Sequence, residues 1–360
     1  MRVGFHLSQL SYRGADIAVF DYAFHNQTLL QNESVIFYKT ERPSESEVVE
    51  KFGQYFKLIP HQDNVQLAKL ADQEKLDTLY FIKSGHRDGD LIGNVPCAVH
   101  AVFPTKPEDF HGDRLAFVSQ WLAKEYSNRK VSFVPHMIHL PEIAGDLRES
   151  LNIPKDATVL ACYGGQDSFN LSFVHEVILK VLDRRKDLYF VFMNISPFAK
   201  HERLFFLPGS AKMDFKMCFI NTADGMIHAR GIGESFGLAC AEFSIKNKPV
   251  ITYAFSPQRS HIEILGDKAM LYKGKKDLEE LLLNFNPQIQ HQQNWDAYSK
   301  DFLPSSVMNQ FQEVFLSTPV NKGAGNNRSA IPDISFIDRA TIQAYRLQRK
   351  IRNLYKKVYL

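Results

Sequence analysis

Short apolar runs that end in turn residues alternate with segments of helical spacing along most of the chain, and this alternation constrains the fold most strongly. The pattern is typical of α/β units, in which parallel strands buried on both faces are joined by crossover helices. It runs from residue 2 to about 141, is interrupted by a polar segment at 142–157, and then restarts. The sequence therefore predicts two doubly wound, Rossmann-like α/β domains that face each other across a cleft.

The predicted elements follow from apolar periodicity and turn residues. In the first half of the chain we expect strands at 2–7, 35–38, 56–59, 78–83, 97–102, 115–118 and 131–134, with helices at 15–30, 45–52 and 65–74. In the second half we expect strands at 159–163, 188–193, 217–220, 225–228 and 250–253, with helices at 173–183, 236–246 and 277–285. The predicted domains are residues 1–143 and 151–316, followed by a Gly, Asn and Ser-rich linker at 317–330 and a basic helix at 331–360.

Charge is distributed unevenly along the 360 residues. The formal net charge is +3, but the last twenty residues hold six basic and no acidic side chains, so residues 1–340 carry a net −3. A slightly acidic body does not predict a nucleic-acid partner. The hydrophobic share of 44% is that of an ordinary globular chain and excludes global disorder.

The cysteines and the first residues indicate a reducing compartment. Four cysteines are widely spaced and form no C-x-x-C pair, so neither a disulfide framework nor a zinc knuckle is indicated. The chain begins MRVGFHLSQL, without the basic region and long apolar run of a signal peptide, and no stretch approaches the roughly 18 apolar residues of a membrane span. We therefore expect a cytoplasmic protein.

The segment IHARGIGESFGLACAE, residues 227–242, is the strongest candidate for a functional site. It joins a predicted strand to a predicted helix, and ligands of α/β folds bind at the carboxyl ends of strands. Glu234 and Glu242 are eight residues apart, which on a helix places both carboxylates on broadly the same side, where they can accept hydrogen bonds from sugar hydroxyls. Between them, four backbone N–H groups are expected to face a diphosphate, those of Ser235, Phe236, Gly237 and Leu238.

Two other interpretations of this segment compete with sugar binding. An acidic side chain at a helix start also stabilises the helix through its macrodipole, with no ligand. The glycines form G-x-G-x-x-x-G, one residue longer than the dinucleotide fingerprint and in the second domain, so a dehydrogenase is disfavoured.

The same segment, continued as FSIKNKPVITY, resembles the E-x7-E signature of retaining GT-B glycosyltransferases of family 4, and the resemblance extends over about residues 1–315. It implies a GT-B fold with an N-terminal acceptor domain and a C-terminal donor domain. It also implies transfer of a sugar from a UDP- or GDP-linked donor to a hydroxyl of a glycan or other acceptor, with retention of configuration and without a metal or other cofactor. In that family the first glutamate faces the transferred sugar and the second binds the nucleotide ribose, roles that would fall on Glu234 and Glu242.

Two further loops lie where the same family has residues that contact the donor phosphates. Arg13 and Gly14 follow the first strand, where the family has a glycine-rich loop over the donor phosphates, although a plain strand-to-helix turn also explains the glycine. Gly164 and Gly165 follow the first strand of the second domain, where the family often has an Arg and a Lys that this chain lacks. Arg230 is the expected substitute, because a guanidinium binds phosphate oxygens bidentately, although a solvated loop arginine is an equal alternative.

Residues of the first domain could also serve the site. Lys83 and Asp88 lie after the strand 78–83 and are candidates to contact acceptor or donor. Asp88 and Asp90 form Asp-x-Asp, which in another glycosyltransferase fold binds a divalent cation, but an Asp-Gly turn is the more common explanation. His100 resembles the histidine near the reacting sugar in family 4, and its alternative is a structural role. We predict no metal site.

Two choices stay open at the level of function. Without the Arg and Lys pair, the chain could be a GT-B subunit that binds a nucleotide or glycan without turnover. The basic tail, 344–360, carries one apolar face flanked by Arg and Lys, so it could lie on anionic lipid at the inner membrane face or pack on the protein.

Overall fold

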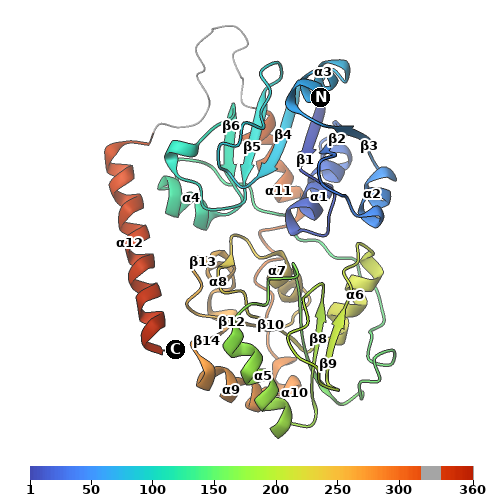
Figure 1. Ribbon diagram of the computed structural model, residues 1–360, viewed down its shortest axis with the longest axis vertical. Helices are drawn as coiled ribbons and strands as arrows, with labels where there is room; N and C mark the ends of the chain where they lie inside the picture. Colours follow the sequence, from blue (N-terminus) through green and yellow to red (C-terminus); the bar gives the residue numbers. More distant parts are fainter. Residues whose placement is uncertain (318–333, 360) are drawn as a thin grey trace. The chain divides into compact units, whose positions relative to one another are not determined.

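The computed structural model describes residues 1–317 and 334–359 and divides into two compact units (Figure 1). Unit 1 comprises Met1–Met137 and Asp301–Leu347, and unit 2 comprises Ile138–Lys300 and the chain from Gln348 onward. The predicted linker at 317–330 lies outside the described residues, except for Ser317.

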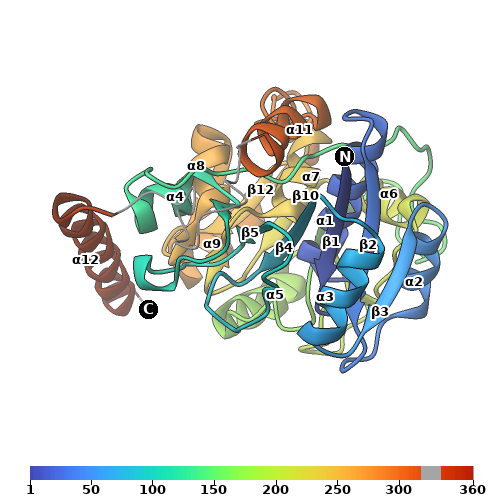
Figure 2. The same ribbon diagram turned by 90° about the horizontal axis from the view of Figure 1, so that it is seen from above.

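Unit 1 is built on a six-stranded parallel sheet in the order β3-β2-β1-β4-β5-β6. Figure 2 shows β5, β4, β1 and β2 side by side in this order. The strands are β1 (Arg2–Leu7), β2 (Glu33–Lys39), β3 (Lys57–His61), β4 (Thr78–Lys83), β5 (Cys97–Ala101) and β6 (Arg114–Phe117). The helices are α1 (Gly14–Thr28), α2 (Ser46–Gly53), α3 (Asn64–Gln73) and α4 (Gln120–Ser127), with a short 3-10 turn η1 (Pro107–Asp109). Strands β1, β4 and β5 are buried along almost their whole length. A strand covered on both faces is apolar throughout, which explains why the sequence predicts these strands closely.

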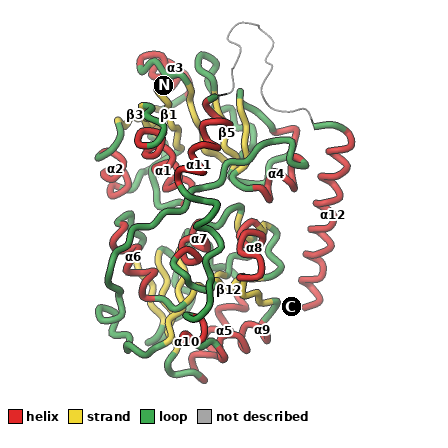
Figure 3. Tube along the Cα trace, turned by 180° about the vertical axis from the view of Figure 1, so that it is seen from behind, coloured by secondary structure: helices red, strands yellow, loops and turns green. Residues whose placement is uncertain are grey.

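Unit 2 repeats the same winding in a sheet of order β14-β12-β10-β7-β8-β9. Its strands are β7 (Thr158–Tyr163), β8 (Leu188–Met193), β9 (Leu204–Leu207), β10 (Gly225–His228), β12 (Val250–Tyr253) and β14 (Ala269–Tyr272). Its helices are α5 (Ser172–Arg184), α6 (Met213–Thr222), α7 (Leu238–Ile245), α8 (Ser260–Leu265), α9 (Lys275–Asn284) and α10 (Pro287–Gln290), with a 3-10 turn η2 (Gly266–Lys268). A separate two-stranded ladder joins β11 (Gly233–Glu234) to β13 (Gln258–Arg259). Figure 3 shows both kinds of element in each unit, strands in yellow and helices in red.

The two predicted doubly wound domains are therefore confirmed, while several elements differ from the sequence prediction. Residues 217–220 were predicted as a strand but belong to helix α6, whose inward positions recur at helical spacing. The segment 131–134 forms only an isolated bridge between Phe133 and Phe117. Helix α7 begins at Leu238 rather than at Phe236, because Gly233 and Glu234 pair with β13 and Gly237 caps the helix in a left-handed conformation.

Residues 301–317 pack in unit 1, although the second domain was predicted to extend to residue 316. Helix α11 (Pro304–Phe311) and the π-helical turn η3 (Gln312–Leu316) carry the rings responsible. The ring of Phe311 stacks on Phe5 of β1 at 6.2 Å between centroids, and Phe315 meets Tyr80 of β4 edge-on at 5.3 Å. All four rings are buried, so this returning segment completes the aromatic core of unit 1.

Helix α12 (Phe336–Tyr359) lies within the predicted basic tail. Its first part is attached to unit 1, where Asn128 donates a hydrogen bond of 2.9 Å to Asp338 and Ile342 is buried. Further along, Leu347 and Ile351 expose 58% and 45% of their surface. In the part of the chain that the structure describes, no helix is both long and apolar enough to cross a membrane.

Candidate functional site

The two sheets have the same strand order, and in each the order of successive strands reverses at one point. In unit 2 this switch point lies between β7 and β10, which are neighbours although they are far apart in sequence. Open α/β sheets bind ligands in the crevice at the carboxyl ends of the strands at this point. Tyr163 ends β7 and His228 ends β10, so the residues that follow them are the candidates in unit 2.

Two glycines shape the loop between β10 and α7. Gly233 has φ of +77°, and a Cβ there would lie 2.0 Å from the carbonyl oxygen of Gln258, its partner in the small ladder. Gly237 has φ of +96°, and a Cβ would approach the Cβ of His261 to 2.9 Å. Both positions require glycine because of conformation and space. The loop thereby holds Glu234 four residues before the helix, not on the helix as the spacing argument assumed.

Glu234 is held by two partners, one on each carboxylate oxygen. Nε2 of His228 lies 3.1 Å from Oε1, and Arg230 donates a hydrogen bond of 2.7 Å to Oε2. Burial by itself would raise the pKa of Glu234, but the hydrogen bond from His228 and the charge of Arg230 outweigh it and lower the pKa to about 2. Glu234 is therefore an ionised carboxylate in a mostly buried position.

Glu242 lies on α7, and its carboxylate is also engaged at both oxygens. Lys216 of α6 donates a hydrogen bond of 2.6 Å to Oε1, and the hydroxyl of Tyr163 donates to Oε2. The Lys216 ammonium also lies 5.6 Å from the centroid of the Tyr163 ring. Lys216 and Tyr163 were missed by sequence reasoning. Lys216 directly precedes the segment 217–220, which we predicted as a strand. Its place on helix α6, beside Glu242, could therefore not be inferred.

The two glutamates thus have matching surroundings: each carboxylate is paired with one cation of unit 2. Arg230, the expected substitute for the absent Arg and Lys pair, is bound to Glu234, and Lys216 is a second cation near the same helix. Ser235, Phe236 and Leu238 lie with Gly237 between the two glutamates, at the start of α7. This arrangement offers acceptors for hydroxyl groups beside two cations and a helix amino terminus.

Gly164 and Gly165 directly follow β7, as predicted. The carbonyl of Gly164 accepts a hydrogen bond of 2.7 Å from Asn194. Gly165 is exposed, and a Cβ added there would meet no heavy atom within 4 Å, so this glycine is not required by packing. Their role toward a donor stays a prediction.

In unit 1, Arg13 and Gly14 lie where β1 is followed by α1, with Arg13 as the exposed cap residue of the helix. The neighbouring Asp16 is buried and accepts a hydrogen bond of 2.5 Å from Ser11. Burial raises the pKa of Asp16 to about 6. The role of Arg13 and Gly14 toward donor phosphates stays a prediction.

Lys83 and Asp88 are paired with each other at the end of β4. Asp90, the second acid of Asp-x-Asp, accepts hydrogen bonds of 2.7 and 2.9 Å from Lys39. Both aspartates are therefore partners of lysines in unit 1. Among the described residues, no group of three or more His, Cys, Asp or Glu side chains is arranged to hold a metal ion.

His100 is fully buried in unit 1 and both of its ring nitrogens are engaged. Nδ1 lies 2.6 Å from the hydroxyl of Tyr80, and Nε2 lies 2.8 Å from the carbonyl oxygen of Val134, to which it must donate. Burial lowers the pKa of His100 to about 3. These contacts favour the structural alternative for His100 that the sequence left open, and a catalytic role stays a prediction.

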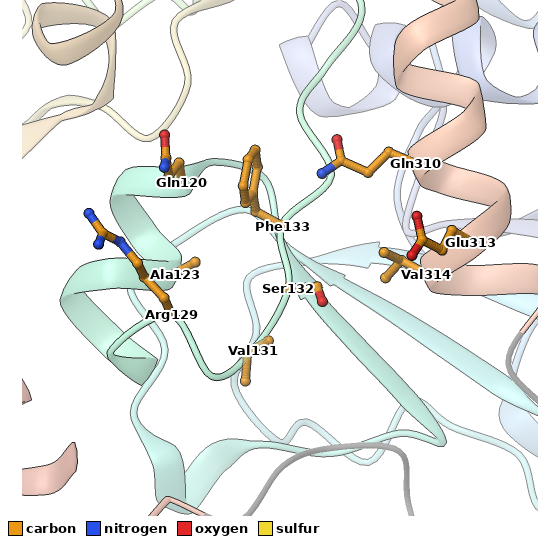
Figure 4. A pocket seen from close by; sticks show the side chains of 9 residues that line it. All are labelled: Gln120, Ala123, Arg129, Val131, Ser132, Phe133, Gln310, Glu313 and Val314. Carbon is orange, nitrogen blue, oxygen red and sulfur yellow. The ribbon is translucent and has the colours of Figure 1, made fainter. Parts of the chain in front are cut away.

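A separate hollow of about 260 Å³ lies in unit 1, where α4 and the loop after it meet α11 and η3 (Figure 4). None of the predicted site residues lines it. Its lining residues are Gln120, Ala123, Arg129, Val131, Ser132, Phe133, Gln310, Glu313 and Val314.

The fold is that of GT-B proteins, and comparison with solved structures supports this class. HepE of Anabaena, solved with UDP and glucose, aligns with a TM-score of 0.67 at 13% identity over 88% of this chain and all of that chain. A glycosyltransferase of Rickettsia africae aligns with a TM-score of 0.60 at 10% identity over 88% of this chain and 99% of that one. A Listeria monocytogenes protein described as a UDP-N-acetylglucosamine 2-epimerase aligns with a TM-score of 0.57 at 12% identity, over 89% and 97%.

At these identities the similarity shows the fold alone, and the shared fold includes proteins with different reactions. No protein-family model and no curated protein sequence matches the chain.

Proposed function

We propose that this protein is a glycosyltransferase of the retaining family 4 type, which moves a sugar from a UDP- or GDP-linked donor to a hydroxyl acceptor. The observation that carries the proposal is the pair of carboxylates at the switch point of unit 2, Glu242 buried and Glu234 mostly buried, each oriented by its own cation. Carboxylates held in this way are suited to accept hydrogen bonds from the hydroxyls of a sugar and of a ribose.

The chemistry requires stabilisation of two charges that develop together. The bond between the anomeric carbon and the diphosphate oxygen breaks, which leaves a positively charged, oxocarbenium-like sugar and an anionic leaving group. We assign Glu234 to the sugar and Glu242 to the ribose. Arg230 and the amino terminus of α7 are assigned to the diphosphate, and Lys216 is added to them as a second cation near that helix.

Proton transfer needs no dedicated side-chain base in this proposal. The acceptor hydroxyl forms the new bond to the anomeric carbon on the face that the leaving group departs from. Its proton passes to an oxygen of the leaving diphosphate. The configuration at the anomeric carbon is thereby retained, and no metal or other cofactor is invoked.

A donor screen tests this function. We expect the purified protein, incubated with a panel of UDP- and GDP-sugars, to release the nucleoside diphosphate from at least one donor by transfer or slow hydrolysis, detected by mass spectrometry. A change of sugar configuration with the nucleotide still attached would indicate epimerisation instead. Saturable nucleotide binding by calorimetry without turnover of any donor would indicate a non-catalytic subunit, and either result would overturn the proposal.

We further propose that the basic tail contacts an anionic lipid surface at the inner membrane face, which would bring the site near a lipid-linked acceptor. The support is charge and exposure: the last twenty residues hold six basic and no acidic side chains, and Leu347 and Ile351 are exposed on α12. Each basic residue near an anionic surface contributes about 1 kcal/mol of attraction, which salt screens.

Vesicle co-sedimentation checks the tail. We expect the full chain to sediment with vesicles containing phosphatidylglycerol but not with phosphatidylcholine alone. Binding should decrease in the double variant Leu347→Gln, Ile351→Gln and in high salt. Ile289→Gln, which changes an equally exposed apolar side chain on α10, is the matched control and should bind as the wild type does. The lipid contact would be excluded if the wild type sedimented equally with both vesicle types and the double variant did the same.

A further inference from the structure

Glu234 is the first member of a row of hydrogen-bonded side chains that continues into the interior of unit 2. Behind it lie His228 at the end of β10, Thr252 on β12 and His261 on α8, all buried. The hydroxyl oxygen of Thr252 lies 2.8 Å from Nδ1 of His228 and 3.0 Å from Nε2 of His261. With the contact of 3.1 Å from His228 Nε2 to Glu234, four side chains form one continuous row.

The proton positions in this row are coupled, because Thr252 has one hydroxyl proton and two imidazole neighbours. It can donate to only one ring and must accept from the other. At the near end, an ionised Glu234 only accepts, so Nε2 of His228 must carry a proton. At the far end, Nδ1 of His261 is buried and has no hydrogen-bond partner among the described residues.

Only one of the two directions leaves no buried N–H group unpaired. If Thr252 donates to Nδ1 of His228, then Nε2 of His261 is protonated and donates to Thr252. Nδ1 of His261 is then unprotonated, so it needs no acceptor. If Thr252 donates to His261 instead, the proton of His261 moves to Nδ1, where no acceptor is present, and His228 must also carry a proton at Nδ1. A buried donor without an acceptor is the more costly outcome, so the first direction is favoured.

We propose that Thr252 and His261 are positioning residues which lock His228 as the neutral Nε2–H tautomer and so direct its N–H at Glu234. The carboxylate is then fixed through Oε1 by this row and through Oε2 by Arg230. That this fixed carboxylate holds the donor sugar rests on the proposed function. The direction of the hydrogen bonds does not depend on it. Burial also lowers the pKa of His261 well below its usual value, in agreement with a neutral ring at the end of the row.

The ring tautomers can be measured directly by ¹⁵N NMR of histidine-labelled protein, with no donor present. We expect His228 and His261 to be neutral Nε2–H tautomers at pH 7, each assigned among the thirteen histidines by its Gln variant. In Thr252→Val, Nδ1 of His228 loses its hydrogen-bond donor while Nε2 still faces Glu234, so we expect the Nδ1 ¹⁵N signal to shift toward that of an imidazole nitrogen that accepts no hydrogen bond, or the ring to become doubly protonated beside the carboxylate. Thr252→Ser retains the hydroxyl and should restore the wild-type signals.

The matched control is Thr222→Val, which removes another fully buried threonine hydroxyl of unit 2, on α6, and should leave the His228 signals unchanged. A wild-type His228 that is doubly protonated, or protonated only at Nδ1, would overturn the proposal. So would a Thr252→Val spectrum identical to the wild type. If Thr252→Val does not fold, the wild-type tautomers still decide. Failure of the donor screen would leave this result unaffected, so the two proposals can fail separately.

Discussion

Replacing Glu234 by glutamine is expected to lower kcat for sugar transfer by about 10²- to 10³-fold, the usual effect of removing one preorganised charged group from a transition state. Glutamine has nearly the same shape, so the ground-state contacts of the sugar are largely kept and KM should change little. The lost negative charge, however, no longer stabilises the positive charge that develops on the sugar. Steady-state kinetics with the donor identified by the screen would measure both constants.

The matched control is Glu263→Gln on α8, which neutralises an exposed glutamate of the same unit. Its kcat should be that of the wild type. A Glu234→Gln enzyme with kcat within about threefold of wild type would remove Glu234 from the chemical step.

The Glu242→Ala variant should bind the nucleoside diphosphate about 10- to 100-fold more weakly, because it loses the charged acceptor proposed for the ribose hydroxyls, a contact of about 1.5–3 kcal/mol. Since the ribose is present in the nucleoside as well, the affinities for UDP and uridine, or for GDP and guanosine, should fall by similar factors. Isothermal titration calorimetry gives both values.

Glu279→Ala is the control for Glu242→Ala. Glu279 is also ion-paired in unit 2, with Lys180 and Arg184, but it lies on α9 and is remote from α7 in sequence. Its removal should leave nucleotide affinity unchanged. An unchanged dissociation constant for Glu242→Ala with every accepted nucleotide would contradict the ribose assignment.

The fold could be predicted from the sequence because the inner strands of both sheets are buried on both faces. The runs at 78–83, 188–193, 225–228 and 250–253 coincide with β4, β8, β10 and β12, since nothing in a doubly covered strand interrupts the apolar run. Helix α6 was missed because Met217, Phe219 and Ile220 are buried close together, so that a short apolar run at one end of the helix imitates a strand.

The site could be predicted only as far as it is local in sequence. Glu234 and Glu242 share one segment, whereas their partners come from other elements: Lys216 from α6, Tyr163 from β7 and Thr252 from β12. Such partners become neighbours only through the sheet order, which places β7 beside β10 and β10 beside β12. Arg230 was proposed as a phosphate ligand on proximity, and the structure adds that it is also the counter-ion of Glu234.

The aromatic core of unit 1 has a consequence for the order of folding during synthesis. Phe5 and Tyr80 are made early, but Phe311 and Phe315, which cover them, are made after nearly the whole of unit 2. At 5–20 residues per second, the ribosome needs roughly 10 to 35 s to proceed from the end of the first segment to these rings. During that time the N-terminal sheet exposes an apolar surface, so the second unit can finish folding before the first.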